Sequence, residues 1–170
     1  MRIWMLSSCL ALLTTSACSD DMSGNMGQQL DQMDPHMTAL QGELDQHARG
    51  TAGASDLGAM STEEDRHMPA ATGHADMMMG MMGQMMQMCR HMSSNNAPDT
   101  AGMQTAMQGM RDECARHRTA MAGQTDVASA RAEESRHATA MTDMMGRMRD
   151  MMGGMRGQAG SFHCGSDHHM

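Results

Sequence analysis

The chain has 170 residues, a formal net charge of −8 and 29 Met, but only one Phe, one Trp and no Tyr. A net negative charge argues against binding to nucleic acid, whose phosphates attract Lys and Arg, and is consistent with attraction of cations. Beyond residue 17 there are only four Leu, one Val and no Ile, a composition that would usually predict disorder. An ordered core would have to be built from Met, an adaptable residue that specifies packing poorly.

Residues 1–17 have the features of an export signal. Arg2 precedes an apolar run from Ile3 to Leu13, which is too short to span a membrane, and small residues then lead to Cys18. The segment Thr15-Ser16-Ala17-Cys18 resembles the processing site of bacterial lipoproteins, in which the Cys is lipidated and becomes the first residue of the mature protein. This resemblance implies export to the bacterial cell envelope and a periplasm-facing protein anchored by lipid at Cys18, with the outer membrane as the preferred location. Cleavage near Ala17 without lipidation would instead give a free periplasmic protein.

An internal repeat emerges when the chain is compared with itself at an offset of 70 residues. The offset aligns Glu43 with Glu113, His47 with His117, Asp56 with Asp126, Glu63-Glu64 with Glu133-Glu134, and Arg66-His67 with Arg136-His137, besides several Met. These charged and imidazole residues lie outside the Met-rich tracts, so the match is not an effect of low complexity. A repeat of this length indicates one supersecondary unit used twice.

Each unit is predicted to be a helical hairpin. Apolar residues and potential metal ligands recur at steps of three and four along four segments, Leu30–His47, Glu64–Met92, Met103–Met121 and Ala130–Met155. Loop-type residues mark breaks at 50–58, 93–99 and 123–126, and Ser61-Thr62-Glu63-Glu64 has the pattern of a capping box for the second helix. The sequence therefore predicts an all-α, antiparallel up-down-up-down four-helix bundle over residues 29–157, with repeats at about 29–92 and 99–157. Residues 18–28 would form a tether, and residues 158–170 a flexible tail rich in His, Cys and Met.

A cluster of Glu and His is expected at the end of the bundle where both hairpins turn. Its members are Glu43, His47, Glu64 and His67, with their copies Glu113, His117, Glu134 and His137. Spacings of three or four residues place each Glu and His on one helix face. Imidazole and carboxylate together suit copper(II), zinc or iron. The simpler alternative is that Glu64 caps its helix and that the His side chains are hydrated at the end of the bundle.

Part of this cluster resembles the metal site of ferritin-like di-metal carboxylate bundles, which use one Glu from each of two helices and Glu-x-x-His from the other two. The corresponding residues are Glu43, Glu64, His67, Glu113, Glu134 and His137. The resemblance implies an oxidase acting on copper or iron, which is the enzymatic alternative to a protein that only binds metal.

Met fills the predicted seams of the second and fourth helices. The candidate ligands there are His74, Met78, Met81, Met85, Met88, Met141, Met144, Met148, Met151 and Met155, and Cys114 joins them on the third helix. A Met stripe at this spacing is normally core packing. However, Leu and Ile would specify a core better, and Met77, Met79, Met86 and Met145 lie off the main seams. Because thioether sulfur selects copper(I), the Met seams predict copper(I) binding.

In its plan and its density of metal-binding side chains, the segment from Leu30 to Gln158 resembles bacterial copper storage proteins, and more loosely the Met- and His-rich periplasmic copper-resistance proteins. The resemblance implies a non-enzymatic protein that sequesters or relays copper(I) and copper(II), with zinc or iron as alternatives at the Glu/His cluster. We expect metal ions as partners and a membrane contact only through the lipid anchor. A ferritin-like oxidase and a structural lipoprotein without metal are the competing hypotheses.

Overall fold

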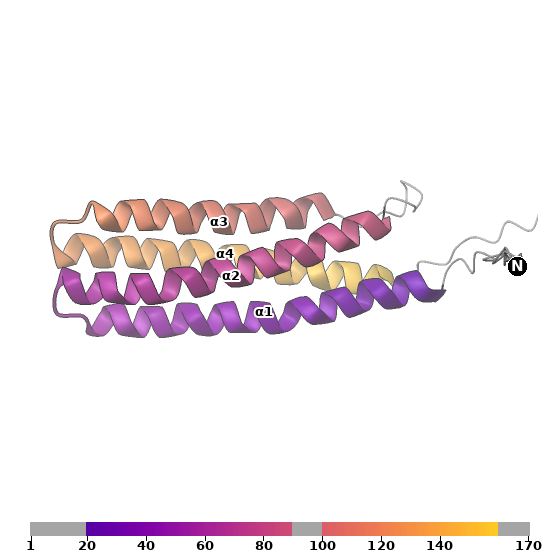
Figure 1. The fold of residues 1–170 in the computed structure, drawn as a ribbon, viewed down its shortest axis with the longest axis horizontal. Helices are drawn as coiled ribbons and strands as arrows, with labels where there is room; N and C mark the ends of the chain where they lie inside the picture. The colour runs from indigo at the N-terminus through magenta and orange to yellow at the C-terminus, as the bar shows by residue number, and fades with distance from the viewer. Residues whose placement is uncertain (1–19, 90–99, 160–170) are drawn as a thin grey trace, which may run out of the picture.

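Four helices make up the described part of the chain. The computed structural model describes residues 20–89 and 100–159, with side chains described over 25–87 and 100–158. The helices are α1 (Asp20–Gly53), α2 (Leu57–Cys89), α3 (Thr100–Ala122) and α4 (Val127–Ala159). They pack as a four-helix bundle (Figure 1), which confirms the prediction of an all-α four-helix bundle. The predicted export signal, the lipidation site Cys18 and the tail beyond residue 159 lie outside the described residues.

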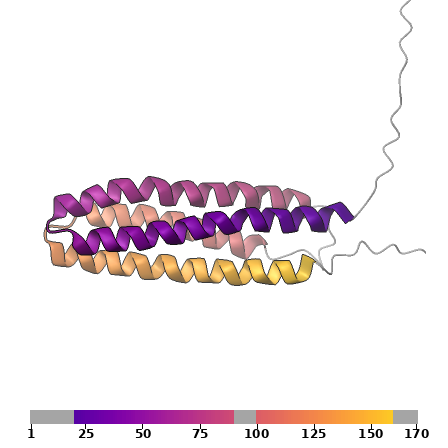
Figure 2. The ribbon, with the colours of Figure 1, turned by 90° about the horizontal axis from the view of Figure 1, so that it is seen from below.

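Helices that follow each other in sequence also lie next to each other in space. α1 contacts α2 and α4, and α3 contacts the same two helices. The α1–α2 loop and the α3–α4 loop lie at the same end of the bundle (Figure 1), and α1 runs between α2 and α4 in Figure 2. We call this end the turn end. Within the described ranges, no helix is both long enough and apolar enough to cross a membrane.

An Asp side chain begins each of the two helices that start at the turn end. Oδ1 of Asp56 accepts a hydrogen bond of 2.9 Å from the backbone N–H of Ala59, and Asp126 caps α4 in the same way. The capping box predicted from Ser61 to Glu64 is therefore wrong, because Asp56 starts α2 earlier. Glu64 lies inside the helix, and its carboxylate is free for another role.

α1 is longer than the sequence pattern predicted at both of its ends. It begins at Asp20, so the expected tether is helical from that residue onward, and it continues into the predicted break as far as Gly53. Met26 is 2 % exposed and lies one turn before Leu30, so the apolar face of the helix extends further towards the N-terminus than expected.

The core consists mainly of Met. Among the described buried apolar side chains, sixteen are Met and three are Leu. Buried positions recur at the offset of 70 residues, for example in the pairs Met33/Met103, Met37/Met107, Met78/Met148 and Met85/Met155. Met is therefore the main packing material of this bundle, as its abundance in the sequence indicated.

The buried faces of α2 and α4 differ from the predicted seams. Ala75, Met82, Met145 and Met152 are buried, whereas the predicted His74, Met81, Met144 and Met151 are only half-buried. The predicted and observed seams share positions 71, 78 and 85, and positions 141, 148 and 155. Between these positions the order of the steps is exchanged, so the helix takes four and then three residues where the prediction has three and then four.

Buried polar side chains form a layer between two apolar clusters. Ala54, Met60 and Ala130 form a small cluster at the turn end, and Leu57 and Val127 pack against it. The large Met-rich cluster fills the rest of the bundle. Buried Glu and His occupy the helix positions between these clusters, so apolar side chains cover the polar layer from both sides along the bundle axis.

Candidate metal centre

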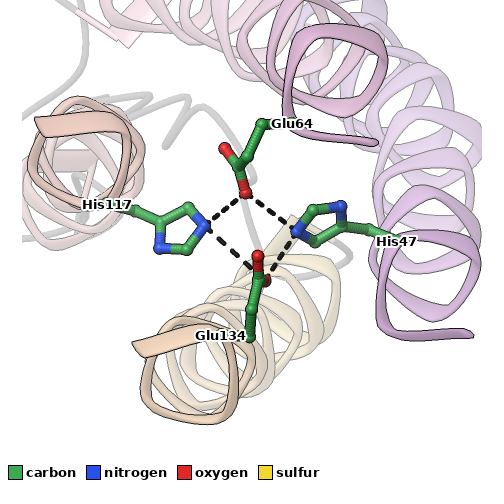
Figure 3. A group of neighbouring side chains, drawn as sticks. All are labelled: His47, Glu64, His117 and Glu134. Carbon is green, nitrogen blue, oxygen red and sulfur yellow. Dashed lines mark hydrogen bonds and ion pairs between the residues drawn. The ribbon is translucent and has the colours of Figure 1, made fainter. Parts of the chain in front are cut away.

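Each helix contributes one side chain to a group of four potential metal ligands. His47 comes from α1, Glu64 from α2, His117 from α3 and Glu134 from α4. Their exposed fractions lie between 0 % and 7 %. Figure 3 shows the four side chains pointing toward one another between the helices. We call these four residues the His/Glu centre; all four belong to the predicted cluster.

The ligand atoms of the His/Glu centre have spacings close to those that one metal ion requires. His47 Nε2 lies 2.7 Å from Glu134 Oε2 and 3.0 Å from Glu64 Oε1. His117 Nε2 lies 2.6 Å from Glu64 Oε1 and 3.7 Å from Glu134 Oε2. In a tetrahedral site with metal–ligand distances near 2.0–2.1 Å, the ligand atoms are about 3.3 Å apart. Since all four atoms lie within 4.8 Å of one another, small side-chain shifts would bring them onto one ion.

The side chains of the centre shift one another's pKa values. Burial alone would lower the pKa of His47, but hydrogen bonds and charges from Glu134 and Glu64 outweigh burial and raise this pKa to about 9. The pKa of His117 is also raised, because Glu64 and Glu133 outweigh the effect of burial. The two imidazoles lower the pKa of Glu64 well below its usual range, although burial acts in the opposite direction. A bound cation would therefore replace protons on the imidazoles.

Two further His side chains stack on those of the centre. His67 stacks on His47 with 4.3 Å between ring centroids, and His137 stacks on His117 at 4.0 Å. Both are 0 % exposed. Burial and the positive charges of neighbouring His lower the pKa of His67 to about 3 and that of His137 to about 4, so both are neutral at pH 7. His137 Nδ1–H donates to Glu113 Oε1 at 2.9 Å, whereas neither nitrogen of His67 has a hydrogen-bond partner among the described residues.

Glu43 and Glu113 lie at the edge of the polar layer against Arg side chains. Glu113 Oε1 accepts hydrogen bonds from Arg116 Nη2 at 2.6 Å and from Arg136 Nη2 at 2.7 Å. Glu43 Oε2 lies 3.8 Å from Arg66 Nη1. Of the six residues implied by the ferritin-like resemblance, Glu64 and Glu134 belong to the His/Glu centre. Arg side chains hydrogen-bond Glu113, whereas Glu43 Oε2 lies near Arg66 without a hydrogen bond among the described residues.

A surface pocket gives the centre a route to solvent. The pocket has a volume of about 240 Å³, lies between α1 and α4, and is lined by His47 and Glu134 together with Leu44, Thr51 and Arg131. A buried metal site needs such an entry path.

The other predicted ligands lie deeper in the bundle or beside its core. Five of the predicted Met are buried in the Met-rich cluster: Met78, Met85, Met141, Met148 and Met155. Four predicted residues are half-buried beside it: His74, Met81, Met144 and Met151. The side chain of Met88 lies outside the described residues. Cys114 is 3 % exposed. Burial, together with the charge of Glu113, raises the pKa of its thiol to about 11, so it is protonated at neutral pH.

Two contacts of the predicted residues were missed by the sequence analysis. His36 Nδ1 lies 3.3 Å from His74 Nδ1, and Glu133 Oε1 accepts a hydrogen bond of 3.1 Å from His117 Nδ1. The first contact could have been found, because a hairpin that turns at 54–56 brings position 36 opposite 74 just as it brings 47 opposite 64. The sequence pattern did not indicate a contact between Glu133 and His117, since the adjacent Glu134 was the better candidate for a metal ligand.

Comparison of the chain with protein-family models, with curated proteins and with solved structures finds no match. Four-helix bundles serve many unrelated functions, so the fold class does not decide the function. The function has to be inferred from the chemistry of the centre.

Proposed function

We propose that this protein binds a transition-metal ion in the His/Glu centre and that copper is its physiological metal. The observation that carries the proposal is the convergence of four buried ligand atoms, one from each helix, within 4.8 Å. Buried ion pairs contribute little to stability compared with well-packed apolar residues. Binding of a cation gives this polar layer a function that stability alone does not provide.

Two properties of the chain support copper. Copper(II) binds sites of imidazole and carboxylate more tightly than the other divalent first-row ions. The centre also adjoins a core with sixteen buried Met, and thioether is the ligand class that selects copper(I). A protein that binds copper(II) at the centre and copper(I) along the Met seams would sequester or relay both oxidation states. Zinc or iron at the centre is the alternative.

We further infer that the bundle consists of two copies of one helical hairpin in up-down-up-down order. Support comes from the two hairpin loops at the same end of the bundle (Figure 1) and from the recurrence of buried positions at an offset of 70 residues. His47 and Glu64 of the first hairpin would then be matched by His117 and Glu134 of the second. Duplication of a two-ligand hairpin is a simple way to obtain four ligands around one axis.

Export and lipidation at Cys18 are proposed from the N-terminal sequence alone. Met ligands suit the oxidising cell envelope, because thioethers cannot be lost to disulfide formation. Metabolic labelling with a fatty-acid analogue tests this part of the proposal: the label should be incorporated into the wild-type protein and absent from Cys18→Ala.

Competition titrations with a copper(II) chelator test the metal proposal. The double variant His47→Ala/His117→Ala should bind copper(II) at least about 100-fold more weakly than the wild type, because it loses both imidazoles of the centre. His36→Ala is the matched control, since His36 is a half-buried His outside the centre, and should change the affinity little. Equal affinities in the wild type and the double variant would overturn the proposal.

A further inference from the structure

Unsatisfied polar atoms are concentrated around the His/Glu centre. Eight buried side-chain nitrogen and oxygen atoms have no hydrogen-bond partner in the described part of the chain. Seven of them belong to the polar layer: Glu43 Oε2, His47 Nδ1, Glu64 Oε2, Glu134 Oε1, His137 Nε2 and both nitrogens of His67. Each such atom loses the hydrogen bonds that it makes with water in the unfolded chain, and folded proteins contain few of them. Their concentration in one layer indicates a ligand that they bind.

We propose that the bundle binds a second metal ion beside the first, held by Nε2 of His67 and of His137 and by the second carboxylate oxygens of Glu64 and Glu134. This inference rests on the proposed function, because the two Glu would bridge both ions. The second ligand set again consists of two imidazoles and two carboxylates, so the second ion is also a divalent first-row transition ion.

The two His pairs have the same spacing across the bundle. The ring centroids of His47 and His117 are 6.2 Å apart, with an interplanar angle of 85°. Those of His67 and His137 are also 6.2 Å apart, with an angle of 75°. A metal ion 2.0–2.1 Å from a ring nitrogen lies roughly 3.2 Å from the ring centroid. In a tetrahedral site the two centroids would be about 5.2 Å apart, so each pair can share one ion after its rings approach by roughly 1 Å.

The stacking of the rings sets the distance between the two ions. The stacked pairs are separated by 4.3 Å and 4.0 Å, and ions in two-metal sites are about 3.5–4 Å apart. The two oxygens of one carboxylate can bridge ions at this distance. One oxygen of Glu64 and one of Glu134 contact the His of the centre, while the other oxygen of each is buried and has no partner among the described residues.

His137 is held in the way that metal-binding His side chains usually are. Its Nδ1–H donates to Glu113 Oε1 at 2.9 Å, which fixes the tautomer and leaves the lone pair on Nε2. His67 Nδ1 lies 4.0 Å from Glu43 Oε2, so the first hairpin has the same pairing at a longer distance. The edge Glu are thus outer partners of the second ion's ligands.

Equilibrium dialysis against zinc(II) and elemental analysis of the full chain test the second site. The variant His67→Leu/His137→Leu should hold one zinc fewer than the wild type and retain the first ion. His47→Leu/His117→Leu, which removes the imidazoles of the first ion, is the matched variant. Wild-type zinc content in the first variant, with loss of zinc in the second, would overturn the second site and leave the proposed function intact. Equal content in all three proteins would overturn both.

Copper(II) provides a measurement that does not require the variants to fold. Two copper(II) ions at the separation of a two-metal site, about 4 Å, couple magnetically. The wild-type chain loaded with two equivalents of copper(II) should therefore lose most of the signal of isolated copper(II) in electron paramagnetic resonance. A spectrum with the full intensity of two isolated ions would overturn the second site.

Discussion

Replacement of His67 by Met is expected to stabilise the metal-free protein, although His67 belongs to the polar layer. Its side chain is 0 % exposed, and neither ring nitrogen has a hydrogen-bond partner among the described residues. An apolar side chain of similar size removes the cost of such an unsatisfied group. Met is already the main core residue here, and its flexible thioether adapts to irregular space without needing a hydrogen bond.

Two opposing effects determine the size of the gain. Removal of the unsatisfied imidazole contributes roughly 2–3 kcal/mol. Loss of the stack on His47, whose centroid lies 4.3 Å away, costs about 0.5–1.5 kcal/mol. The net gain of about 0.5–2.5 kcal/mol corresponds to a rise in Tm of roughly 1–10 °C for a chain of this size. His137→Met should gain less, because it also loses the 2.9 Å hydrogen bond to Glu113.

Thermal unfolding followed by circular dichroism in excess EDTA measures this effect. His36→Met is the control, since the half-buried His36 has a partner in His74, and its Tm should stay close to that of the wild type. In excess zinc(II) the order should reverse, because the His67 variant loses a ligand and with it part of the stabilisation by metal. A metal-free His67→Met protein that melts below the wild type would refute the reasoning.

Three other results are expected. Copper(I) at 100 times its Kd under reducing conditions should add about 2.7 kcal/mol to stability and raise the Tm by roughly 5–10 °C, and an unchanged melting curve would contradict binding by the Met seams. Urea unfolding across pH should show maximal metal-free stability near pH 6.5. The pKa of His47 is raised to about 9, so its contribution to the free energy of unfolding is lost as the pH rises from 6.5 to 9. The pKa of His67 is lowered to about 3, so its contribution to the free energy of unfolding is lost as the pH falls below 6.5. Glu64→Ala should lower the free energy of unfolding by about 3–5 kcal/mol in the same assay, because it leaves a buried imidazolium without its partner. Glu63→Ala removes only the exposed ion pair with Arg66 and should lower it by less than about 1 kcal/mol.

The number and packing of the helices could be predicted because helical periodicity is a local property of the sequence. The steps of three and four residues and the polar breaks identify four segments without knowledge of their contacts. Which of two adjacent residues faces the core could not be predicted in this way. Whether Met144 or Met145 is buried depends on the order of the three- and four-residue steps between positions 141 and 148, and two adjacent Met give no sign of that order.

The composition of the polar layer was also predictable, but its arrangement was not. Repetition of Glu and His at the same offset indicated which residues matter. Which of them meet depends on competition for partners, and Arg116 and Arg136 draw Glu113 to the edge of the layer. The same competition leaves Glu64 and Glu134 to face the His of the centre.

The polar layer also has a consequence for how the helices are aligned lengthwise. Met side chains adapt to many surroundings, so a core of Met alone would accept helices displaced by one turn along their axes. Displacement of α4 by one turn would bring Ala130 or Ala138 to the level of Glu134 and leave the buried charge of His47 without this carboxylate. An uncompensated buried charge costs about 3–5 kcal/mol. The residues proposed to bind metal thus also select one longitudinal alignment among those that the Met core would tolerate.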